Sequence, residues 1–375
     1  MHKTLGGIGI REEQIELSNI AAAFCREKSP INKVRELLEQ DQSHAPETWD
    51  EMAELGWLAI AIPEEYGGVG LTLAEAVPVV EHMGRNLMSG PFISTTLAAQ
   101  ILLSGGTPAQ KAEWLPKLAA GTKAALALME LDSRCDLTDL QTVAIRKGDD
   151  IVLTGQKVMV TDVDQADLLI VAARFEDRSA LILLPTNLLS ESAIRRENVI
   201  DETRRSFEVT LDGMTVPSAN MLAPDLAETA FQRFHLAANL LLAAEMCGGT
   251  FSCIEYTVEY LKTRKQFGKQ IGAFQSLKHA TVAAFCDYEK ARSHLYSAAW
   301  NFETPGQDEI AVRMAKAQAD KAFSFAADRA IQFHGGFGFT YECDAHLYRR
   351  RAIWCSAHFG DGAYHKAKLA ELLLD

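Results

Sequence analysis

The sequence R-K-Q-F-G-K-Q-I-G-A-F-Q, residues 264–275, separates two long helical patterns, and the rest of the chain is arranged around it. Upstream, residues 240–262 are rich in Ala and Leu and contain no proline. Downstream, apolar residues recur every three or four positions, which predicts one apolar helix face; they are Phe274, Leu277, Ala280, Ala284, Tyr288, Ala291 and Leu295. Gly268 and Gly272 interrupt the helical pattern between them. We therefore expect a basic connection between two core helices.

This connection can bind an anion. Arg264 offers a fork of donors that suits phosphate oxygens, and Gln266 adds an amide. The alternative is a plain helix–helix turn whose charges face water, because charge runs are usually solvated. From the residues alone, both interpretations stay open.

Composition limits the classes of function. The chain has 375 residues, 48% of them hydrophobic, and a formal net charge of −13. Such a negative charge argues against nucleic acid as the main partner. The seven cysteines show no C-x-x-C pair and no metal-type spacing, which indicates reduced thiols and a cytoplasmic location. We expect no signal peptide and no membrane span, since no suitable apolar run is present.

The order of patterns predicts an α+β fold. Residues 1–122 show helical periodicity, residues 123–224 contain short apolar runs separated by turn pairs, and residues 225–375 are helical again. The middle segment is expected to form a small antiparallel barrel or sandwich. Alternation of strands and helices is absent, which argues against a doubly wound sheet with a Rossmann cofactor site.

A glycine-rich break at residues 331–342, I-Q-F-H-G-G-F-G-F-T-Y-E, is the second informative stretch. Its glycines let backbone amides approach a bulky ligand, and Gln332 carries both a donor and an acceptor. His334 is interpreted as a structural residue rather than a catalytic one. Cys343 is expected in the core.

Six short motifs, taken in order, resemble the acyl-CoA dehydrogenase family over nearly the whole chain. They are W-D-E-M-A-E-L-G-W from Trp49, I-P-E-E-Y-G-G from Ile62, L-T-G-Q-K from Leu153, R-K-Q-F-G-K from Arg264, F-Q-S-L-K-H from Phe274 and Q-F-H-G-G-F-G from Gln332. The resemblance implies an N-terminal helical domain, a middle β-barrel and a C-terminal four-helix bundle, usually assembled as a tetramer. It also implies FAD as cofactor and an acyl-CoA thioester as substrate, with α-proton abstraction by a carboxylate and hydride transfer to flavin N5.

The resemblance assigns cofactor contacts residue by residue. The positions implied to hold the FAD of a neighbouring subunit are Arg264, Gln266, Phe267, Gln275, Gln332 and Gly336. In the middle domain, Met159, Val160 and Thr161 occupy the flavin-facing strand. Thr161 is expected to donate to the flavin, while Met159 replaces the usual aromatic residue.

Two departures from the family pattern concern the chain's own flavin and the base. The usual E-P-G-A-G-S-D segment is E-L-D-S-R-C-D here, residues 130–136, so Cys135 replaces a serine. Met129 stands where a hydroxyl normally meets the flavin edge. Asp361 takes the place of the usual catalytic Glu, and its alternative role is to cap the last helix. The family's other base position falls near Ala238 and Asn239, neither of which can act as a base.

Two functional hypotheses follow. The first is an active FAD-dependent acyl-CoA dehydrogenase, a homotetramer with Asp361 as base and an electron-transfer flavoprotein as electron acceptor. The second is a half-site subunit of a heterotetramer, which completes the FAD site of a paralogous chain through Arg264, Gln266, Gln332 and Gly336. A flavin monooxygenase of the same fold is a weaker third option.

Overall fold

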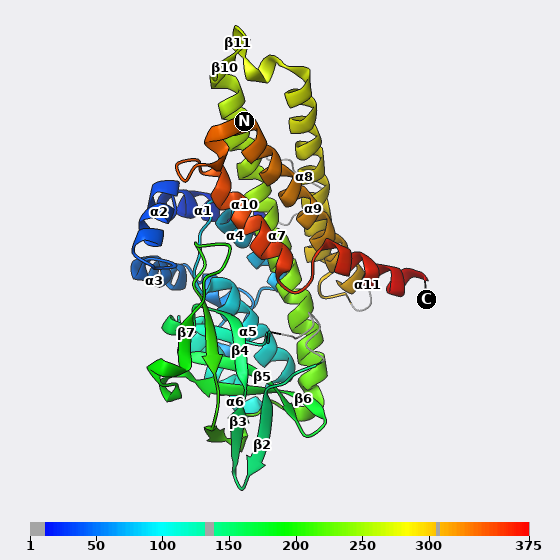
Figure 1. The fold of residues 1–375 in the computed structure, drawn as a ribbon. Helices are drawn as coiled ribbons and strands as arrows, with labels where there is room; N and C mark the ends of the chain where they lie inside the picture. The colour runs from blue at the N-terminus through cyan, green and yellow to red at the C-terminus, as the bar shows by residue number, and fades with distance from the viewer. Residues whose placement is uncertain (1–11, 132–138, 305–307, 375) are drawn as a thin grey trace. The chain divides into compact units, whose positions relative to one another are not determined.

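The computed structural model describes residues 12–131, 139–304 and 308–374, and the chain divides into two compact units. Unit 1 comprises Met1–Glu36, Leu73–Met88 and Asn239–Asp375, and unit 2 comprises Leu37–Thr72 and Ser89–Ala238. Each unit joins segments that are far apart in the sequence. The expected order of helices, strands and helices is confirmed (Figure 1). The division into three consecutive domains at residues 122 and 224 stays a prediction.

Unit 1 is built mainly from long helices. Its elements are α1 (Glu12–Lys28), the first part of α2 (Ile31–Glu39), α4 (Leu73–Arg85), most of α7 (Ala227–Thr263), α8 (Gln275–Asn301), α9 (Asp308–His334), α10 (Ala345–Ala357) and α11 (Gly362–Leu374). Between α7 and α8 lie the short strands β10 (Lys265–Gln266) and β11 (Lys269–Gln270) and the 3-10 helix η8 (Ile271–Ala273). The apolar face predicted for α8 is buried at Ala284, Tyr288, Ala291 and Leu295. Hydrophobic periodicity therefore located this helix correctly.

Two glycines allow α4 and α7 to touch through their backbones. A Cβ atom added at Gly84 would lie 2.1 Å from the Glu245 carbonyl oxygen, and one at Gly248 would lie 1.9 Å from the Glu81 carbonyl oxygen. Any larger residue would push the two helices apart. Buried charges pair close to this crossing: Arg351 lies 2.5 Å from Glu245.

Unit 2 combines short helices with two sheets. Its complete α-helices are α3 (Pro46–Glu54), α5 (Phe92–Gly105) and α6 (Pro108–Ala119), and it also contains the end of α2 and the start of α7. The six-stranded sheet has the order β1-β5-β2-β3-β9, with β6 also paired to β5, and the three-stranded sheet has the order β4-β8-β7. The strands are β1 (Ala124–Ala127), β2 (Val143–Lys147), β3 (Asp150–Thr154), β4 (Gln156–Thr161), β5 (Leu168–Phe175), β6 (Arg178–Pro185), β7 (Ile194–Arg196), β8 (Ser206–Thr210) and β9 (Met214–Pro217).

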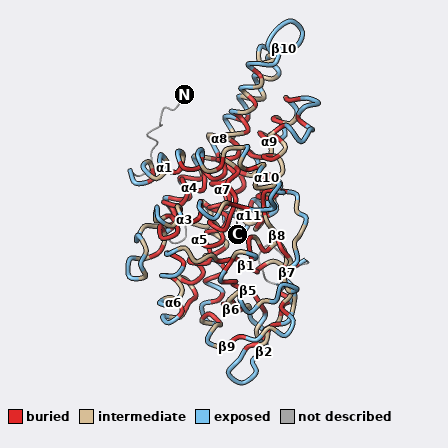
Figure 2. Tube along the Cα trace, turned by 90° about the vertical axis from the view of Figure 1, so that its left-hand side faces the viewer, coloured by how far each residue is buried: buried red, intermediate tan, exposed pale blue. Residues whose placement is uncertain are grey.

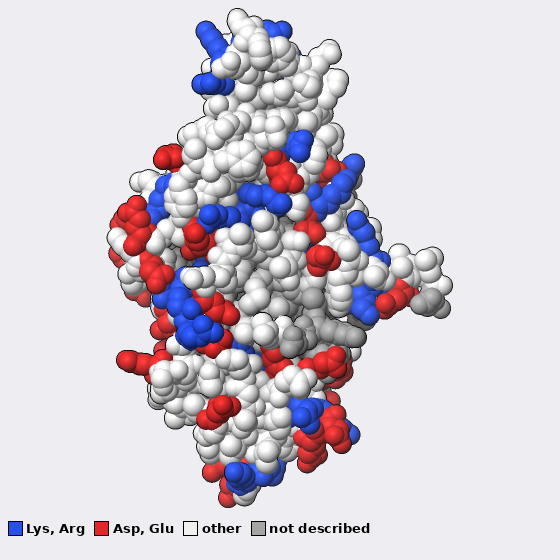
Figure 3. All heavy atoms as spheres, in the orientation of Figure 1, with Lys and Arg blue, Asp and Glu red and all other residues white. Residues whose placement is uncertain are grey.

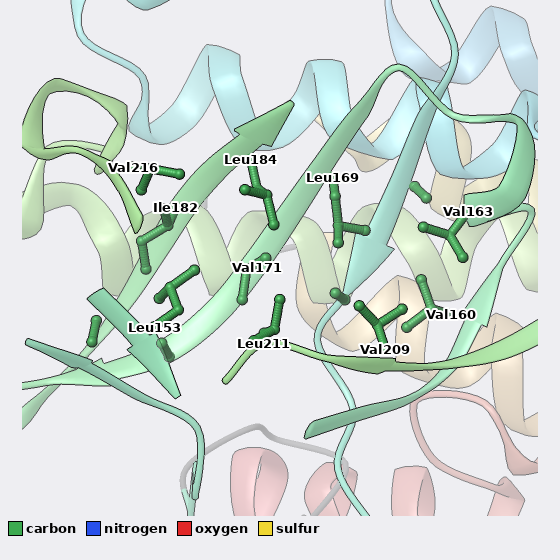
Figure 4. Packing of buried hydrophobic residues seen from close by; sticks show 14 of the residues in the cluster. Leu153, Val160, Val163, Leu169, Val171, Ile182, Leu184, Val209, Leu211 and Val216 are labelled. Carbon is green, nitrogen blue, oxygen red and sulfur yellow. The ribbon is translucent and has the colours of Figure 1, made fainter. Parts of the chain in front are cut away.

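Both sheets contribute to one apolar core (Figure 4). Leu169 and Val171 come from β5 of the larger sheet, while Val160 and Val209 come from β4 and β8 of the smaller one. The strand runs predicted from the sequence all form strands. The expected middle β region is confirmed and most of its strand pairs are antiparallel, but β5 pairs in parallel with both β1 and β2. The direction of a strand is invisible in its hydrophobic pattern, and the long connection between β1 and β5 permits parallel pairing.

Helix α7 is unusually long and apolar. By length and composition it is the one helix within the described ranges that is able to cross a membrane. However, 89% of its apolar window is buried inside the protein, as expected for a core helix. Figure 2 shows this contrast between the buried helical core and the exposed hairpin at β10.

Candidate cofactor and active site

The basic connection predicted at residues 264–275 forms an exposed hairpin. Strands β10 and β11 pair Lys265 with Gln270 and Gln266 with Lys269. This places Arg264 at the end of α7, Gln266 on β10 and Gln275 at the first position of α8. All these side chains are exposed, and Figure 3 shows basic side chains gathered at this end of the molecule.

The hairpin turn holds Phe267 in an unusual conformation. Phe267 and Gly268 both have positive φ values, 52° and 80°, as the tightest hairpin turns require. Glycine tolerates this geometry, but an aromatic residue is strained in it. The ring is 90% exposed and meets Phe274 edge-on, with 6.1 Å between ring centroids. The turn therefore presents an aromatic face outward at a cost in backbone strain.

A stack of three rings joins the glycine turn to the same end of α7. His334 ends α9 and lies between Tyr256 and Tyr260, with ring centroids 4.7 Å and 4.2 Å away. Its Nδ1 is 2.7 Å from the Ala330 carbonyl oxygen, and burial lowers its pKa. These contacts confirm His334 as a structural residue. Because Tyr260 lies one turn before Arg264, the stack sets Gln332 and the glycine turn near the hairpin.

The glycine turn itself is the 3-10 helix η9 (Gly335–Phe339). Gln332 is exposed on the last turn of α9, and an added Cβ at Gly336 would meet nothing within 4 Å. Cys343 is buried, as predicted, 3.7 Å from the Tyr256 hydroxyl. We refer to residues 264–275 and 332–339 together as the donor end of unit 1.

Four polar side chains of the donor end have no polar partner among the described residues. Over the described residues, no hydrogen bond or ion pair involves the side chains of Arg264, Gln266, Gln275 or Gln332. A guanidinium and three amides at one end of a helix form a set of donors suited to an anionic group. The open space at Gly336 leaves room for a ligand to approach the backbone.

The second predicted contact region lies on β4 of unit 2. The register of β4 against β8 shifts between Lys157 and Val160, and Met159 has a φ of 56°. This is a β-bulge, which re-aims the strand. Val158 N donates to the Met129 carbonyl oxygen at 3.0 Å, and Met159 N donates to Glu197 Oε2 at 2.9 Å. Both bulge amides are therefore engaged inside unit 2.

Thr161 follows the bulge at the end of β4. Its neighbour across the ladder is Ser206, and its side chain is half-buried. In the part of the chain that the structure describes, the Thr161 hydroxyl makes no hydrogen bond, so it stays available as a donor. Met129 is half-buried just beyond β1 and offers only a thioether. Cys135 lies outside the described residues.

A buried ion pair supports β4 from behind. Lys157 Nζ lies 2.6 Å from Glu130 Oε1, and both side chains are almost completely buried. Glu130 also accepts from the backbone amides of Gln141 and Thr142. Burial lowers the pKa of Lys157 to about 8, against the opposing effect of Glu130. Burial alone would raise the pKa of Glu130. The hydrogen bonds that Glu130 accepts, above all the one from Lys157, outweigh burial, so the pKa is lowered.

Asp361 lies in the loop between α10 and α11. Its Oδ1 accepts a hydrogen bond from Tyr364 N at 2.8 Å, so it caps α11 as the alternative interpretation predicted. The side chain is nevertheless exposed. Capping and proton transfer use different oxygens of a carboxylate, so this contact leaves the role of a base open.

Three side chains hold the Asp361 loop in place. Lys316 of α9 donates to the carbonyl oxygens of Cys355, His358 and Gly360, at 3.0, 3.4 and 2.8 Å. Asp320, one turn further along α9, accepts from Gly362 N at 2.8 Å. Asn239 Nδ2 donates to the Phe359 carbonyl oxygen at 3.4 Å. The residues at the two positions where the family carries its base, Asn239 and Asp361, therefore lie near each other. The first is an amide and the second a carboxylate.

Comparisons with known proteins agree with this arrangement. Family models of the acyl-CoA dehydrogenase N-terminal and C-terminal domains match residues 11–122 and 228–374. "Acyl-CoA dehydrogenase fadE12" of Mycobacterium bovis is 33% identical over 316 residues, covering 80% of this chain and 80% of that protein. The chain belongs to the acyl-CoA dehydrogenase family. It is therefore an oxidoreductase of the type that acts on CH–CH bonds.

Solved structures show the same fold. A chain from the electron transferring flavoprotein of Acidaminococcus fermentans has a TM-score of 0.88 and 26% identity, covering 98% of this chain and 100% of that chain. A steroid acyl-CoA dehydrogenase variant described as Tcur3481-Tcur3483 has a TM-score of 0.85 and 28% identity, covering 96% and 98%. The fold expected of an acyl-CoA dehydrogenase is thus confirmed.

The two regions fit FAD, the cofactor that the family implies, to different degrees. The donor end fits, because its donors and exposed ring match a pyrophosphate and an adenine. The β4 region fits in part, because Thr161 keeps a free hydroxyl while the Met159 amide is already engaged. Sequence reasoning missed Glu197, Lys316 and Asp320. Nothing in the local sequence marks them, since the Met159 amide, the Cys355 carbonyl oxygen and the Gly362 amide that they bind lie 38 or more residues away.

Proposed function

We propose that this acyl-CoA dehydrogenase removes hydrogen from the Cα and Cβ atoms of an acyl-CoA thioester, with FAD as cofactor. The observation that carries the proposal is the donor end, where four polar side chains are free of partners among the described residues. Arg264 suits the pyrophosphate, Gln266 and Gln332 add amide contacts, and Phe267 offers a ring to the adenine. In an assembly of several chains, these residues would serve a neighbouring subunit's cofactor.

In this proposal Asp361 is the base that takes the α proton. FAD, when bound, supplies the acceptor for the β hydrogen. The residues of the chain position the base: Lys316 and Asp320 fix the loop on either side of Asp361, and Asn239 fixes the Phe359 carbonyl two residues before it. Such positioning matters because small displacements of a base cost rate. An aspartate is one methylene shorter than the usual glutamate, so loop geometry has to supply the reach.

Substitution of Asp361 separates its two roles. Asp361→Asn keeps a good helix cap but removes the base. We expect unfolding to be almost unchanged and the rate at which acyl-CoA bleaches the flavin band to fall roughly 10³-fold. Asp361→Ser is a second cap-preserving variant, and Asp361→Glu tests reach. Bleaching at the wild-type rate in the Asn variant would remove Asp361 from the mechanism.

The β4 region favours a second candidate, a half-site subunit of a heteromeric acyl-CoA dehydrogenase. The engaged Met159 amide and the thioether of Met129 give the chain's own flavin fewer donors than the donor end gives a neighbour's. The solved steroid acyl-CoA dehydrogenase variant carries a double name, Tcur3481-Tcur3483. In this candidate the present chain completes the FAD site of a paralogous partner.

The cofactor content distinguishes the two candidates. The chain is purified alone and with a paralogous acyl-CoA dehydrogenase chain, and FAD per protomer is measured. One FAD per protomer in the isolated chain, bleached by acyl-CoA, supports the active homotetramer. FAD that appears only in the co-purified complex supports the half-site subunit. An electron-transfer flavoprotein as acceptor and a cytoplasmic location belong to both candidates as expectations.

A further inference from the structure

The bulge in β4 creates two backbone donors that the sheet itself does not use. The ladder with β8 pairs Lys157 and Val160 but skips the two residues between them. Val158 N finds the Met129 carbonyl oxygen, which belongs to the backbone just after β1. Met159 N has no backbone partner among the described residues, and the positive φ of Met159 turns it out of the ladder. A bulge amide of this kind is a ready donor for a ligand.

Glu197 occupies that donor. Its Oε2 accepts from Met159 N at 2.9 Å and from the Ser206 hydroxyl at 2.8 Å. Glu197 itself is held in place, because its backbone N donates to the Ser206 carbonyl oxygen at 2.9 Å. A hydrogen bond to an ionised carboxylate is stronger than one to a neutral carbonyl. Any neutral acceptor that approaches Met159 therefore competes with a charged one.

We infer that Glu197 competes with this chain's own flavin for the Met159 amide. The Glu197 carboxylate accepts the hydrogen bond that this amide would otherwise donate to a flavin carbonyl oxygen. The inference rests on the proposed function, in which β4 faces the flavin. The inference gives a physical reason why the β4 region offers its flavin fewer donors than the donor end offers. If FAD were bound here, a neutral carbonyl oxygen of its isoalloxazine ring would meet an occupied donor and a nearby carboxylate.

The test measures FAD affinity rather than turnover. Apo protein is titrated with FAD, and binding is followed by calorimetry and by quenching of flavin fluorescence. Glu197→Ala frees the Met159 amide, and Glu197→Gln keeps the shape of the side chain but removes its charge. Glu208→Gln is the matched control, because Glu208 lies on the same small sheet and pairs with Arg195 at its surface. Thermal unfolding of each variant checks that the fold is kept.

The expected result is that Glu197→Ala binds FAD about tenfold more tightly or better, which corresponds to about 1.4 kcal/mol. Glu197→Gln should shift in the same direction by less, and Glu208→Gln should match the wild type. Unchanged or weaker binding in the folded Glu197 variants would overturn the inference and make Glu197 a structural support of the bulge. Should Glu197→Ala fail to fold, Glu197→Gln decides by the same criterion.

Failure of the inference and failure of the proposed function remain distinguishable. Tighter FAD binding without bleaching by any acyl-CoA supports the inference and contradicts the proposed catalytic role. If acyl-CoA bleaches the flavin of the wild-type protein, the proposed function is supported. If the Glu197 substitutions then leave the FAD affinity unchanged, the inference is overturned.

Discussion

The donor end of unit 1 and the β4 region of unit 2 use their polar groups in opposite ways. At the donor end, Arg264, Gln266 and Gln332 are exposed and make no side-chain hydrogen bond or ion pair with any described residue. Around β4, the Met159 amide, Lys157 and Glu130 are all engaged by partners inside the unit. The resemblance implies that both regions bind FAD: the donor end contacts a neighbouring subunit's FAD, and the β4 region contacts the chain's own. Only the donor end keeps most of its donors for a ligand.

The difference shows what each region depends on for stability. The donor end is held by rings and backbone, through the Tyr256–His334–Tyr260 stack and the hairpin ladder, so its polar side chains are not needed for folding. The β4 region is held by polar contacts in an apolar core, where unpaired groups are costly. Substitutions are therefore expected to weaken ligand binding at the donor end and stability at β4.

The largest expected effect is the loss of the buried pair behind β4. Lys157→Met leaves the Glu130 carboxylate buried without its cationic partner, and breaking such a pair costs about 3 kcal/mol or more. Urea unfolding of the variant measures the loss. Lys147→Met, at the exposed end of β2, is the control and should change stability by less than about 0.5 kcal/mol. Equal effects of the two substitutions would show that the pair does not stabilise unit 2.

The next effect concerns ligand binding without a loss of stability. Arg264→Ala should weaken FAD binding by roughly 10- to 100-fold, because a charge-assisted contact contributes about 1.5–3 kcal/mol. The unfolding midpoint should stay near that of the wild type, since the Arg264 side chain has no partner within the described residues. Lys265→Ala removes an equal charge from the adjacent position on β10 and serves as the control. If both variants lose affinity equally, net charge rather than the guanidinium is responsible.

The smallest expected effect depends on pH and comes from Asp162, which follows Thr161. Burial raises the pKa of Asp162 from its ordinary value of 3.8 to about 6. The folded protein therefore binds this proton more tightly than the unfolded chain, so stability falls as pH rises from about 4 to about 6. Asp162→Asn should remove this dependence and stabilise the protein at pH 7 by about 2 kcal/mol, because asparagine cannot ionise and tolerates the φ of 56°.

Urea unfolding between pH 4 and pH 7 measures this effect. The exposed Asp150→Asn on β3 is the control and should follow the wild-type curve. The wild type should lose more stability between pH 4 and pH 7 than Asp162→Asn does. An equal loss in both proteins would contradict the proposed cost of burying the ionised carboxylate.

Local sequence patterns predicted the elements and the donor end well. The three- and four-residue recurrence along residues 274–295 reflects one buried helix face, and α8 indeed spans Gln275–Asn301. Gly268 supplies a positive φ that the hairpin turn requires, so the break in the pattern had a local cause. The side chains of the motif residues Arg264 and Gln332 are exposed and make no hydrogen bond or ion pair with any described residue.

Other features were decided by pairing across the chain. The parallel pairing of β1 with β5 cannot be read from either strand, since hydrophobic runs carry no direction. The hydrogen bonds from Lys316 to the loop before Asp361 join residues that are 39 to 44 positions apart in the sequence. Whether Asp361 caps a helix, and which oxygen it uses, likewise depends on the start of α11.

By itself the sequence determined the helix–strand–helix order, the family and the basic connection at residues 264–275, because periodicity, glycine placement and short motifs are local properties of a chain. Only the tertiary structure decided which of those motif residues remain free and which are consumed by partners. The Met159 amide is the clearest case: a bulge frees it, and a carboxylate 38 residues away takes it. Hydrogen-bond partners are fixed by folding in space, whereas secondary structure follows from neighbours along the chain.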